Sequence, residues 1–175
     1  VWQDMMFACN IYDLTDDFAK DITAEAEDNI RRIRHHACLG LICGNNEMEN
    51  AWVEWPEFRS HSDELRKDYL RMFEDIIPNI AKEAAPQVFY WPSSPSSGGR
   101  FDKPSDETRG DAHFWDVWHG LADFEEYEKH TMRFVSEFGF QSFPSIKTVK
   151  TFTNESDRNV FSKVMESHQK NKDAN

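Results

Sequence analysis

The chain has 175 residues, of which 39% are hydrophobic and 14% aromatic, a composition typical of globular proteins that excludes disorder throughout. Its formal net charge of −12 at pH 7 would repel a phosphate backbone and anionic lipid head groups, so we expect no nucleic-acid partner. Because no apolar run reaches the roughly 20 residues that span a bilayer, we expect no membrane partner either. The sequence leaves the cellular compartment open.

The first third of the chain is predicted to form a strand, a helix and a second strand. Met5 to Cys9 is a short apolar segment that predicts a strand. A turn-like stretch at 13–16 precedes apolar residues at helical spacing from Phe18 to Ile33. The unbroken apolar run from Leu39 to Cys43 is typical of a buried parallel strand. This order indicates a parallel α/β unit.

A second unit follows with the same order. A helical pattern extends from Leu65 to Ile80, and Pro78 is expected to kink or split this helix. Val88 to Trp91 predicts a third strand. The stretch from Ser93 to Gly99 is rich in Ser, Pro and Gly, and it predicts a long loop. Aromatic residues on both sides of this loop favour an active-site loop within one domain over a linker between domains.

The last third is predicted to hold two more strands, three helices and a polar tail. In chain order these are an aromatic strand or strand end at 111–118, a short helix at 121–130, a strand at 134–136, helices at 146–152 and 160–168, and the tail at 170–175. The alternation favours a parallel α/β fold. An eight-stranded (β/α)8 barrel needs roughly 250 residues, so the chain is either a smaller α/β layer or a piece of a barrel.

Two glutamates stand where such folds carry their chemistry. Glu47 follows the second predicted strand and Glu137 follows the strand at 134–136, and α/β barrels place their active sites at such strand ends. A retaining glycosidase needs two carboxyl groups about 5 to 5.5 Å apart, one as acid and base and one as nucleophile. The pair indicates a sugar-cleaving site. For each glutamate alone, a solvated loop carboxylate or a helix cap remains the alternative.

Aromatic and polar side chains near the predicted loops complete the picture of a sugar site. Tryptophans offer flat apolar faces to a sugar ring, and histidines offer hydrogen-bonding atoms at its rim. The predicted substrate-binding residues of these two types are Trp55, Trp91, Trp115, Trp118, His113 and His119. Trp52 also lies near a loop, and for any single tryptophan a place in the core is an equal alternative.

No metal ion or cofactor is expected. The cysteines Cys9, Cys38 and Cys43 form no CxxC pair, so they are predicted to be small buried hydrophobes rather than zinc ligands or a disulfide framework. The adjacent His35 and His36 have no carboxylate at a metal-binding spacing and are predicted to mark the end of a helix.

Several separated motifs carry a family resemblance. They are WQDMMFACNIYD at 2–13, GNNE at 44–47, GDAHFWDVWHG at 110–120, SEFGFQS at 136–142 and MESHQKN at 165–171. In this order they make the chain resemble glycoside hydrolase family 2, and its β-mannosidase branch most closely. The resemblance covers nearly the whole chain.

The resemblance implies a fold and a set of roles. It implies a partial (β/α)8 TIM barrel over residues 1–175, with roughly strands three to seven of the family's catalytic domain. The first two strands, the last strand and the N-terminal sandwich domains would lie outside this chain. Glu47 would be the general acid and base, Glu137 the nucleophile, and Asn46 a partner of the sugar 2-hydroxyl. Trp55 and His119 match positions of the family's sugar pocket.

The expected function is that of a retaining glycoside hydrolase that releases terminal β-linked mannose through a covalent intermediate, with an oligosaccharide or glycoside as substrate. Two alternatives stay open. One is another family 2 specificity, β-galactosidase or β-glucosaminidase, and the other is a non-catalytic carbohydrate-binding or structural fragment. The 175-residue piece alone is expected to be inactive or weak and to self-associate, because unpaired strand edges invite pairing between chains.

Overall fold

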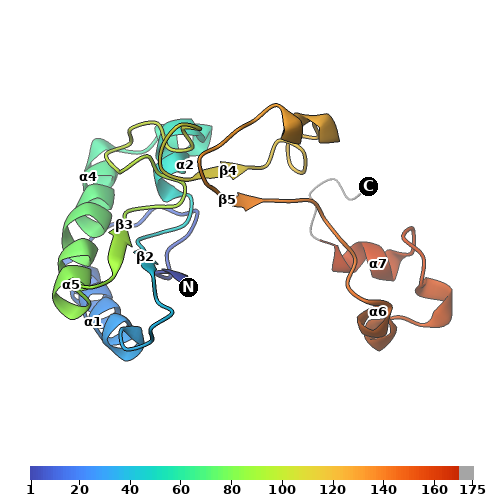
Figure 1. Cartoon of the computed structure of the whole chain (residues 1–175), viewed down its shortest axis with the longest axis horizontal. Coiled ribbons are helices and arrows are strands. Elements are labelled where there is room, and N and C mark those ends of the chain that lie inside the picture. Colours follow the sequence, from blue (N-terminus) through green and yellow to red (C-terminus); the bar gives the residue numbers. More distant parts are fainter. Residues whose placement is uncertain (170–175) are drawn as a thin grey trace. The chain divides into compact units, whose positions relative to one another are not determined.

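The computed structural model describes residues 1–169, and the chain divides into two compact units (Figure 1). Unit 1 comprises residues 1–113 and 131–136. Unit 2 comprises residues 114–130 and the chain from Glu137 onward. The fold is mixed α/β. Among the described residues, no helix is long and apolar enough to cross a membrane.

Unit 1 is built on a parallel three-stranded sheet. Its strands are β1 (Trp2–Asp4), β2 (Leu41–Cys43) and β3 (Phe89–Trp91), in the order β1-β2-β3. The second and third strands and their parallel direction are confirmed. The expected first strand at Met5 to Cys9 is wrong, because the ladder pairs the less apolar segment just before it, whose central residue is exposed.

Helix α1 (Asp16–Ile33) leads from β1 to β2 and confirms the predicted helix. It begins after Thr15, whose side-chain oxygen accepts a hydrogen bond from the backbone N–H of Phe18 and so satisfies one free donor of the first turn. Ile22, Ala26 and Ile30 are buried on one face, at the spacing of successive helical turns. His35 and His36 follow the end of this helix, as predicted.

The second crossover is a series of helices from β2 to β3. They are α2 (Met48–Glu54), α3 (Pro56–Arg59), α4 (Asp63–Arg71), the π-helical turn η1 (Met72–Ile76) and α5 (Ile77–Ala84). Pro78 stands in the first turn of α5, where its missing N–H leaves no bond unmade. Just before it, the N–H of Ile77 bonds to the carbonyl of Met72, five residues back. The helical run from Asp63 to Ala84 therefore continues through Pro78 without a break, with a π-helical turn just before it.

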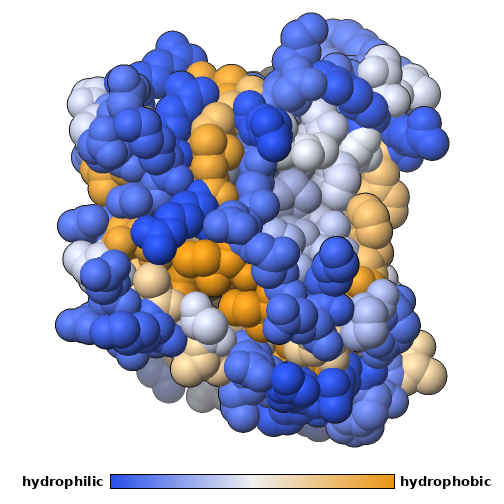
Figure 2. Space-filling model, turned by 90° about the vertical axis from the view of Figure 1, so that its left-hand side faces the viewer, coloured by the Kyte–Doolittle hydropathy of each residue, from blue (hydrophilic) through white to orange (hydrophobic). Residues whose placement is uncertain are grey.

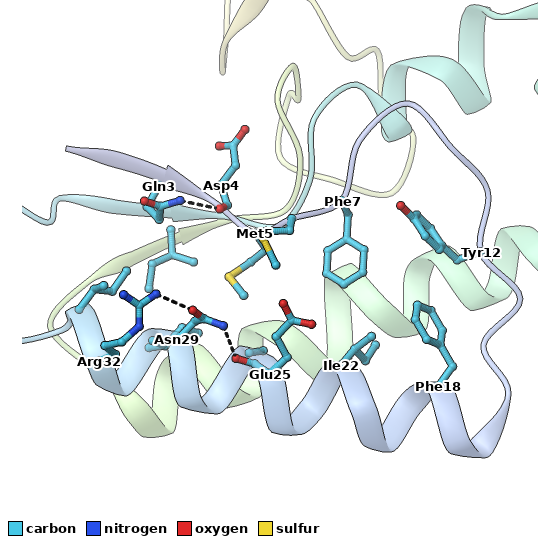
Figure 3. Close-up of a pocket in the computed structure, with 15 residues that line it drawn as sticks. Gln3, Asp4, Met5, Phe7, Tyr12, Phe18, Ile22, Glu25, Asn29 and Arg32 are labelled. Carbon is cyan, nitrogen blue, oxygen red and sulfur yellow. Dashed lines mark hydrogen bonds between the residues drawn. The ribbon is translucent and has the colours of Figure 1, made fainter.

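The core of unit 1 lies between the sheet and its helices. Its largest fully buried apolar side chains are Phe73, Ile30, Ile42, Met48, Met72 and Ile77. Figure 2 looks onto the side that carries α1, α4 and α5, where apolar residues lie between hydrophilic ones. A cavity of about 360 Å³ lies between β1 and α1 and is lined by residues that include Met5, Phe7 and Ile22 (Figure 3).

Strands β4 (Ala112–Phe114) and β5 (Val135–Phe138) form a separate two-stranded sheet. Of the predicted aromatic strand at 111–118, only residues 112–114 form a strand. Glu137 lies within β5 instead of after it, so the expected end of this strand at residue 136 is corrected.

Unit 2 contains short helices. These are the 3₁₀ turn η2 (Phe124–Glu128), α6 (Ile146–Phe152), the 3₁₀ turn η3 (Glu155–Asp157) and α7 (Lys163–His168). Helix α6 confirms the prediction. The helix expected at 160–168 starts later, because Ser162 accepts a hydrogen bond from the N–H of Met165 and caps it there. The predicted tail at 170–175 and the end of the 165–171 motif lie outside the described residues.

Candidate active site

Glu47 stands at the carboxyl ends of the parallel strands of unit 1, as the sequence predicts. Beyond β2 the chain stays in register, since Asn46 forms parallel bridges to Ala8 on one side and to Ser94 on the other. The N–H of Asn46 donates to the carbonyl of Phe7 at 2.9 Å, and the N–H of Glu47 donates to the carbonyl of Ser94 at 2.6 Å. Glu47 therefore lies at the carboxyl edge of the sheet, together with the loops that follow β1 and β3.

The backbone of Glu47 is left-handed, with φ of 61°, immediately before α2. A non-glycine residue in this region costs of order 1 kcal/mol or more, and such strain clusters at functional sites. The side chain of Glu47 is 18% exposed. Its Oε1 atom lies 2.9 Å from Nδ1 of His113, and its Oε2 atom accepts a hydrogen bond from Sγ of Cys9 at 3.3 Å. Both carboxyl oxygens therefore have partners within unit 1.

His113 links Glu47 to the loop after β3. It lies on β4, and its side chain is only 4% exposed. Its Nε2 atom is 3.0 Å from Oγ of Ser94, while Nδ1 faces Glu47. The sequence predicts His113 at the rim of the sugar, and in the structure its two ring nitrogens face Ser94 and Glu47.

Asp111 is a buried carboxylate that connects several segments of the site by hydrogen bonds. It is 3% exposed, and each of its carboxylate oxygens accepts two hydrogen bonds. Oδ1 accepts from the indole N–H of Trp91 at 2.8 Å and from the backbone N–H of Ser96 at 2.9 Å. Oδ2 accepts from the hydroxyls of Ser94 at 2.7 Å and Ser136 at 2.6 Å. This one carboxylate therefore joins β3, the loop after it and Ser136 of β5.

Asn45 is a structural residue of the site that the sequence reasoning missed. It is fully buried, and its Oδ1 atom accepts hydrogen bonds from the N–H of Met48 at 3.1 Å and from Oγ of Ser93 at 2.7 Å. Its Nδ2 atom donates to the carbonyl of Pro92 at 3.1 Å. An Asn three positions before a helical N–H is a helix-capping signal that could have identified it. A Cβ atom at Gly44 would clash with the same carbonyl of Pro92, so this junction requires glycine.

Glu49 is a second residue that the sequence did not single out. It lies on α2 with no exposed surface, and burial raises the pKa of its carboxyl from 4.5 to about 7 against the smaller, opposite effect of hydrogen bonds from Ser96 and Phe101. Its Oε1 atom accepts from the N–H of Phe101 at 2.8 Å. The Phe101 ring packs on Tyr69, with centroids 5.0 Å apart, and the guanidinium of Arg66 lies 4.2 Å from it. These contacts anchor the long loop after β3.

The predicted aromatic residues fall into different environments. In unit 1, Trp55 is half-buried and contacts Phe58 edge-on at 5.5 Å, whereas Trp52 belongs to the core, with 5% exposure. In unit 2, Trp115 and Trp118 are half-buried and pack edge-on at 5.5 Å. The exposed His119 stacks on Trp118 at 5.3 Å.

The remaining predictions concern Glu137 and the cysteines. Glu137 is half-buried at the start of the second segment of unit 2, and it follows Ser136 directly on β5. The expectation that all three cysteines are buried is wrong. Cys43 is buried, but Cys9 and Cys38 are exposed, because they lie in irregular segments and not inside strands.

Comparison with known proteins identifies β-mannosidases. The chain is 35% identical over 183 residues to β-mannosidase B of Aspergillus niger and 34% identical over 179 residues to β-mannosidase B of Emericella nidulans. Each match covers 97% of this chain and 21% of the relative. No family model matches.

A solved structure gives the same result for the fold. The crystal structure of the β-D-mannosidase from Dictyoglomus thermophilum matches 99% of this chain with a TM-score of 0.85 and 36% identity, and the match covers 21% of that chain. The chain thus spans about a fifth of the length of the relatives it matches. The resemblance to β-mannosidases that the motifs indicate is confirmed.

Proposed function

We propose that the protein carrying this chain is a retaining glycoside hydrolase that releases terminal β-linked mannose, with Glu47 as general acid and base and Glu137 as nucleophile. One observation carries the proposal. In a chain about a third identical to β-mannosidases, a half-buried Glu47 stands at the carboxyl ends of a parallel sheet and is paired with His113. A partly desolvated, hydrogen-bonded carboxyl at this edge suits proton transfer better than a solvated one.

The proposed reaction has two steps. In the first, Glu47 gives a proton to the glycosidic oxygen while the Glu137 carboxylate attacks the anomeric carbon, so that the bond to the leaving group breaks and a glycosyl ester forms. In the second, Glu47 takes a proton from a water molecule, which attacks the same carbon and releases Glu137. Two displacements at one carbon retain its configuration.

We propose that the sugar contacts come from the residues that the sequence predicts for this role. Asn46 immediately precedes Glu47 and would donate to the sugar 2-hydroxyl, an interaction that strengthens in the transition state. Trp91, whose indole N–H donates to Asp111 and whose ring packs on Phe89 at 6.0 Å, is a further proposed pocket residue. Trp55, Trp115, Trp118 and His119 are the further proposed pocket residues. His113 remains a proposed residue at the rim of the sugar, and its ring also contacts Ser94 and Glu47.

The same proposal covers the architecture. We take the five strands to be strands three to seven of a (β/α)8 barrel, with β1, β2 and β3 as strands three to five. The parallel order of these three, with helices in both crossovers and Glu47 at the carboxyl edge, supports this arrangement. The remaining strands and the sandwich domains would belong to the rest of the protein.

The test is hydrolysis by the whole protein. Chromogenic β-mannoside, β-galactoside and β-glucosaminide are offered at equal concentration, and the anomer first released is followed by proton NMR. We expect the mannoside to be preferred by kcat/KM and the β-anomer to appear first. Preference for another sugar would establish another specificity. Release of the α-anomer would contradict the retaining mechanism, and sugar binding without turnover would favour the non-catalytic alternative.

A further inference from the structure

Four polar side chains of unit 1 form a continuous line from the buried interior to the proposed acid and base. Asp111 Oδ2 is 2.7 Å from Ser94 Oγ, which is 3.0 Å from His113 Nε2, and His113 Nδ1 is 2.9 Å from Glu47 Oε1. Asp111, at the inner end of this line, is 3% exposed, and the His113 side chain is 4% exposed. Water therefore has little access to these contacts. Each of these distances is that of a hydrogen bond.

The single hydrogen of the Ser94 hydroxyl decides how the line is protonated. Three acceptors lie within reach, Asp111 at 2.7 Å, His113 at 3.0 Å and Ser136 at 3.3 Å. The carboxylate is the strongest acceptor and the nearest, so the hydrogen points at Asp111. Ser94 Oγ then presents lone pairs to His113, and the contact between them requires a hydrogen on Nε2.

With Nε2 protonated, the other side of the ring is determined as well. A neutral imidazole carries one hydrogen, so its Nδ1 atom would offer a lone pair to Glu47. Two lone pairs repel, and the 2.9 Å contact therefore needs a second hydrogen, held either by the Glu47 carboxyl or by Nδ1 of an imidazolium. In both arrangements the pair of residues holds one proton between them.

We propose that His113 is a positioning residue that keeps the proton of the general acid in place on Glu47, and that Ser94 and Asp111 impose the tautomer that this requires. The inference rests on the proposed function. In the first step the pair delivers its proton to the glycosidic oxygen as the bond to the leaving group breaks and the bond to Glu137 forms. After this step the lone pair of His113 Nδ1 faces the Glu47 carboxylate. Their repulsion favours uptake of a proton from the attacking water as the bond to Glu137 breaks.

The experiment compares two serine variants of the whole protein. Ser94→Ala and Ser136→Ala each remove one hydroxyl that donates to Oδ2 of Asp111, but only Ser94 contacts His113. Values of kcat/KM are measured with phenyl β-mannoside, whose leaving group needs a proton, and with 2,4-dinitrophenyl β-mannoside, whose leaving group does not. Activity on the second substrate also shows that each variant is folded.

We expect Ser94→Ala to lower kcat/KM for the phenyl glycoside about tenfold or more relative to the dinitrophenyl glycoside, a part of the roughly 10²-fold or greater contribution of general acid catalysis. Ser136→Ala should leave that ratio as in the wild type. His113→Gln, which can still reach toward Ser94 but cannot hold the imidazole's second proton, should show the same selective loss as Ser94→Ala.

Two results would overturn the inference in different ways. If the wild type hydrolyses both mannosides and the ratio is unchanged in Ser94→Ala and His113→Gln, the line of hydrogen bonds is structural only, while the proposed function stands. If the wild type hydrolyses neither mannoside, the proposed function itself fails, and the role of His113 fails with it.

Discussion

The Nδ1 atom of His113 lies 2.9 Å from the Oε1 atom of Glu47, although 66 positions separate the two residues in the chain. The contact joins two different parts of the fold, because Glu47 lies between β2 and α2 and His113 lies in the middle of β4. Folding of unit 1 therefore gives the proposed acid and base a fixed partner that sequence proximity does not reveal.

Replacing Glu47 should affect substrates according to their leaving groups. In Glu47→Ala, we expect hydrolysis of phenyl β-mannoside to fall by about 10²-fold or more, and the first step with 2,4-dinitrophenyl β-mannoside to change far less, since that leaving group needs no proton. The measurement is kcat/KM for both substrates.

Added azide provides the control for this variant. Azide attacks the glycosyl ester without help from a base, so it should partly restore turnover of the dinitrophenyl substrate and yield mannosyl azide. Equal losses with both substrates and no response to azide would show that Glu47 is only structural.

Asp111 should contribute strongly to stability. In Asp111→Ala, the buried N–H groups of Trp91 and Ser96 lose their acceptor, and each unsatisfied buried donor costs about 1–3 kcal/mol. We expect a loss of about 3 kcal/mol or more in the free energy of unfolding, measured with urea. Asp111→Asn keeps an oxygen for these donors and should cost about 1 kcal/mol. Equal losses in both variants would argue against the hydrogen-bonding role.

We expect the buried Glu49 to make the free energy of unfolding fall as the pH rises. Its pKa is raised from 4.5 to about 7 by burial, so the folded chain binds the proton more tightly than the unfolded chain. The stabilisation is complete below about pH 4.5 and is lost as the pH rises to about 7, by at most about 3 kcal/mol. Glu49→Gln stays neutral and should lack this component.

The measurement for Glu49 is the difference between wild type and Glu49→Gln in the free energy of unfolding at pH 5 and pH 7.5. Other titrating groups cancel in this comparison. We expect the wild type to lose more stability than the variant on going to pH 7.5, and parallel behaviour of the two proteins would rule out a raised pKa.

The sequence predicted the parts of the fold that depend on local periodicity. Apolar spacing located α1 and α6, and unbroken apolar runs located β2 and β3. The strand β1 was misplaced because tertiary pairing, which local hydrophobicity does not encode, selected its register. The expected helix at 121–130 is only a short 3₁₀ turn.

The candidate site could be predicted in its chemical groups but not in its connections. Glu47 was recognisable from its place after a strand. The hydrogen-bonding partners of Asp111 and Ser94 were not, because a buried carboxylate with four donors brings together residues as far apart as Trp91 and Ser136. Such partners depend on long-range folding and leave no periodic signal in the sequence.

The 175-residue chain alone should be inactive or weak and should self-associate. Within the described residues, β1 pairs only with β2, so only one of its two edges is paired. An exposed strand edge invites pairing with another chain, and a catalytic site loose by about 1 Å loses on the order of 10²-fold in rate. Light scattering and aryl β-mannoside assays on the isolated chain and the whole protein test this; a monomeric chain with near-full activity would contradict it.

The assignment of Glu137 as nucleophile is the central claim, because a covalent glycosyl ester on this residue distinguishes a retaining hydrolase from an inverting one and from a non-catalytic fragment. Replacing Glu137 with Gln should leave folding intact and remove nearly all turnover. The most direct measurement is labelling of the whole protein with an activated 2-deoxy-2-fluoro-β-mannoside, followed by peptide mass spectrometry. We predict one fluoromannosyl group, attached to Glu137. A label on any other residue, or rapid hydrolysis of normal mannosides with no label at all, would contradict the account.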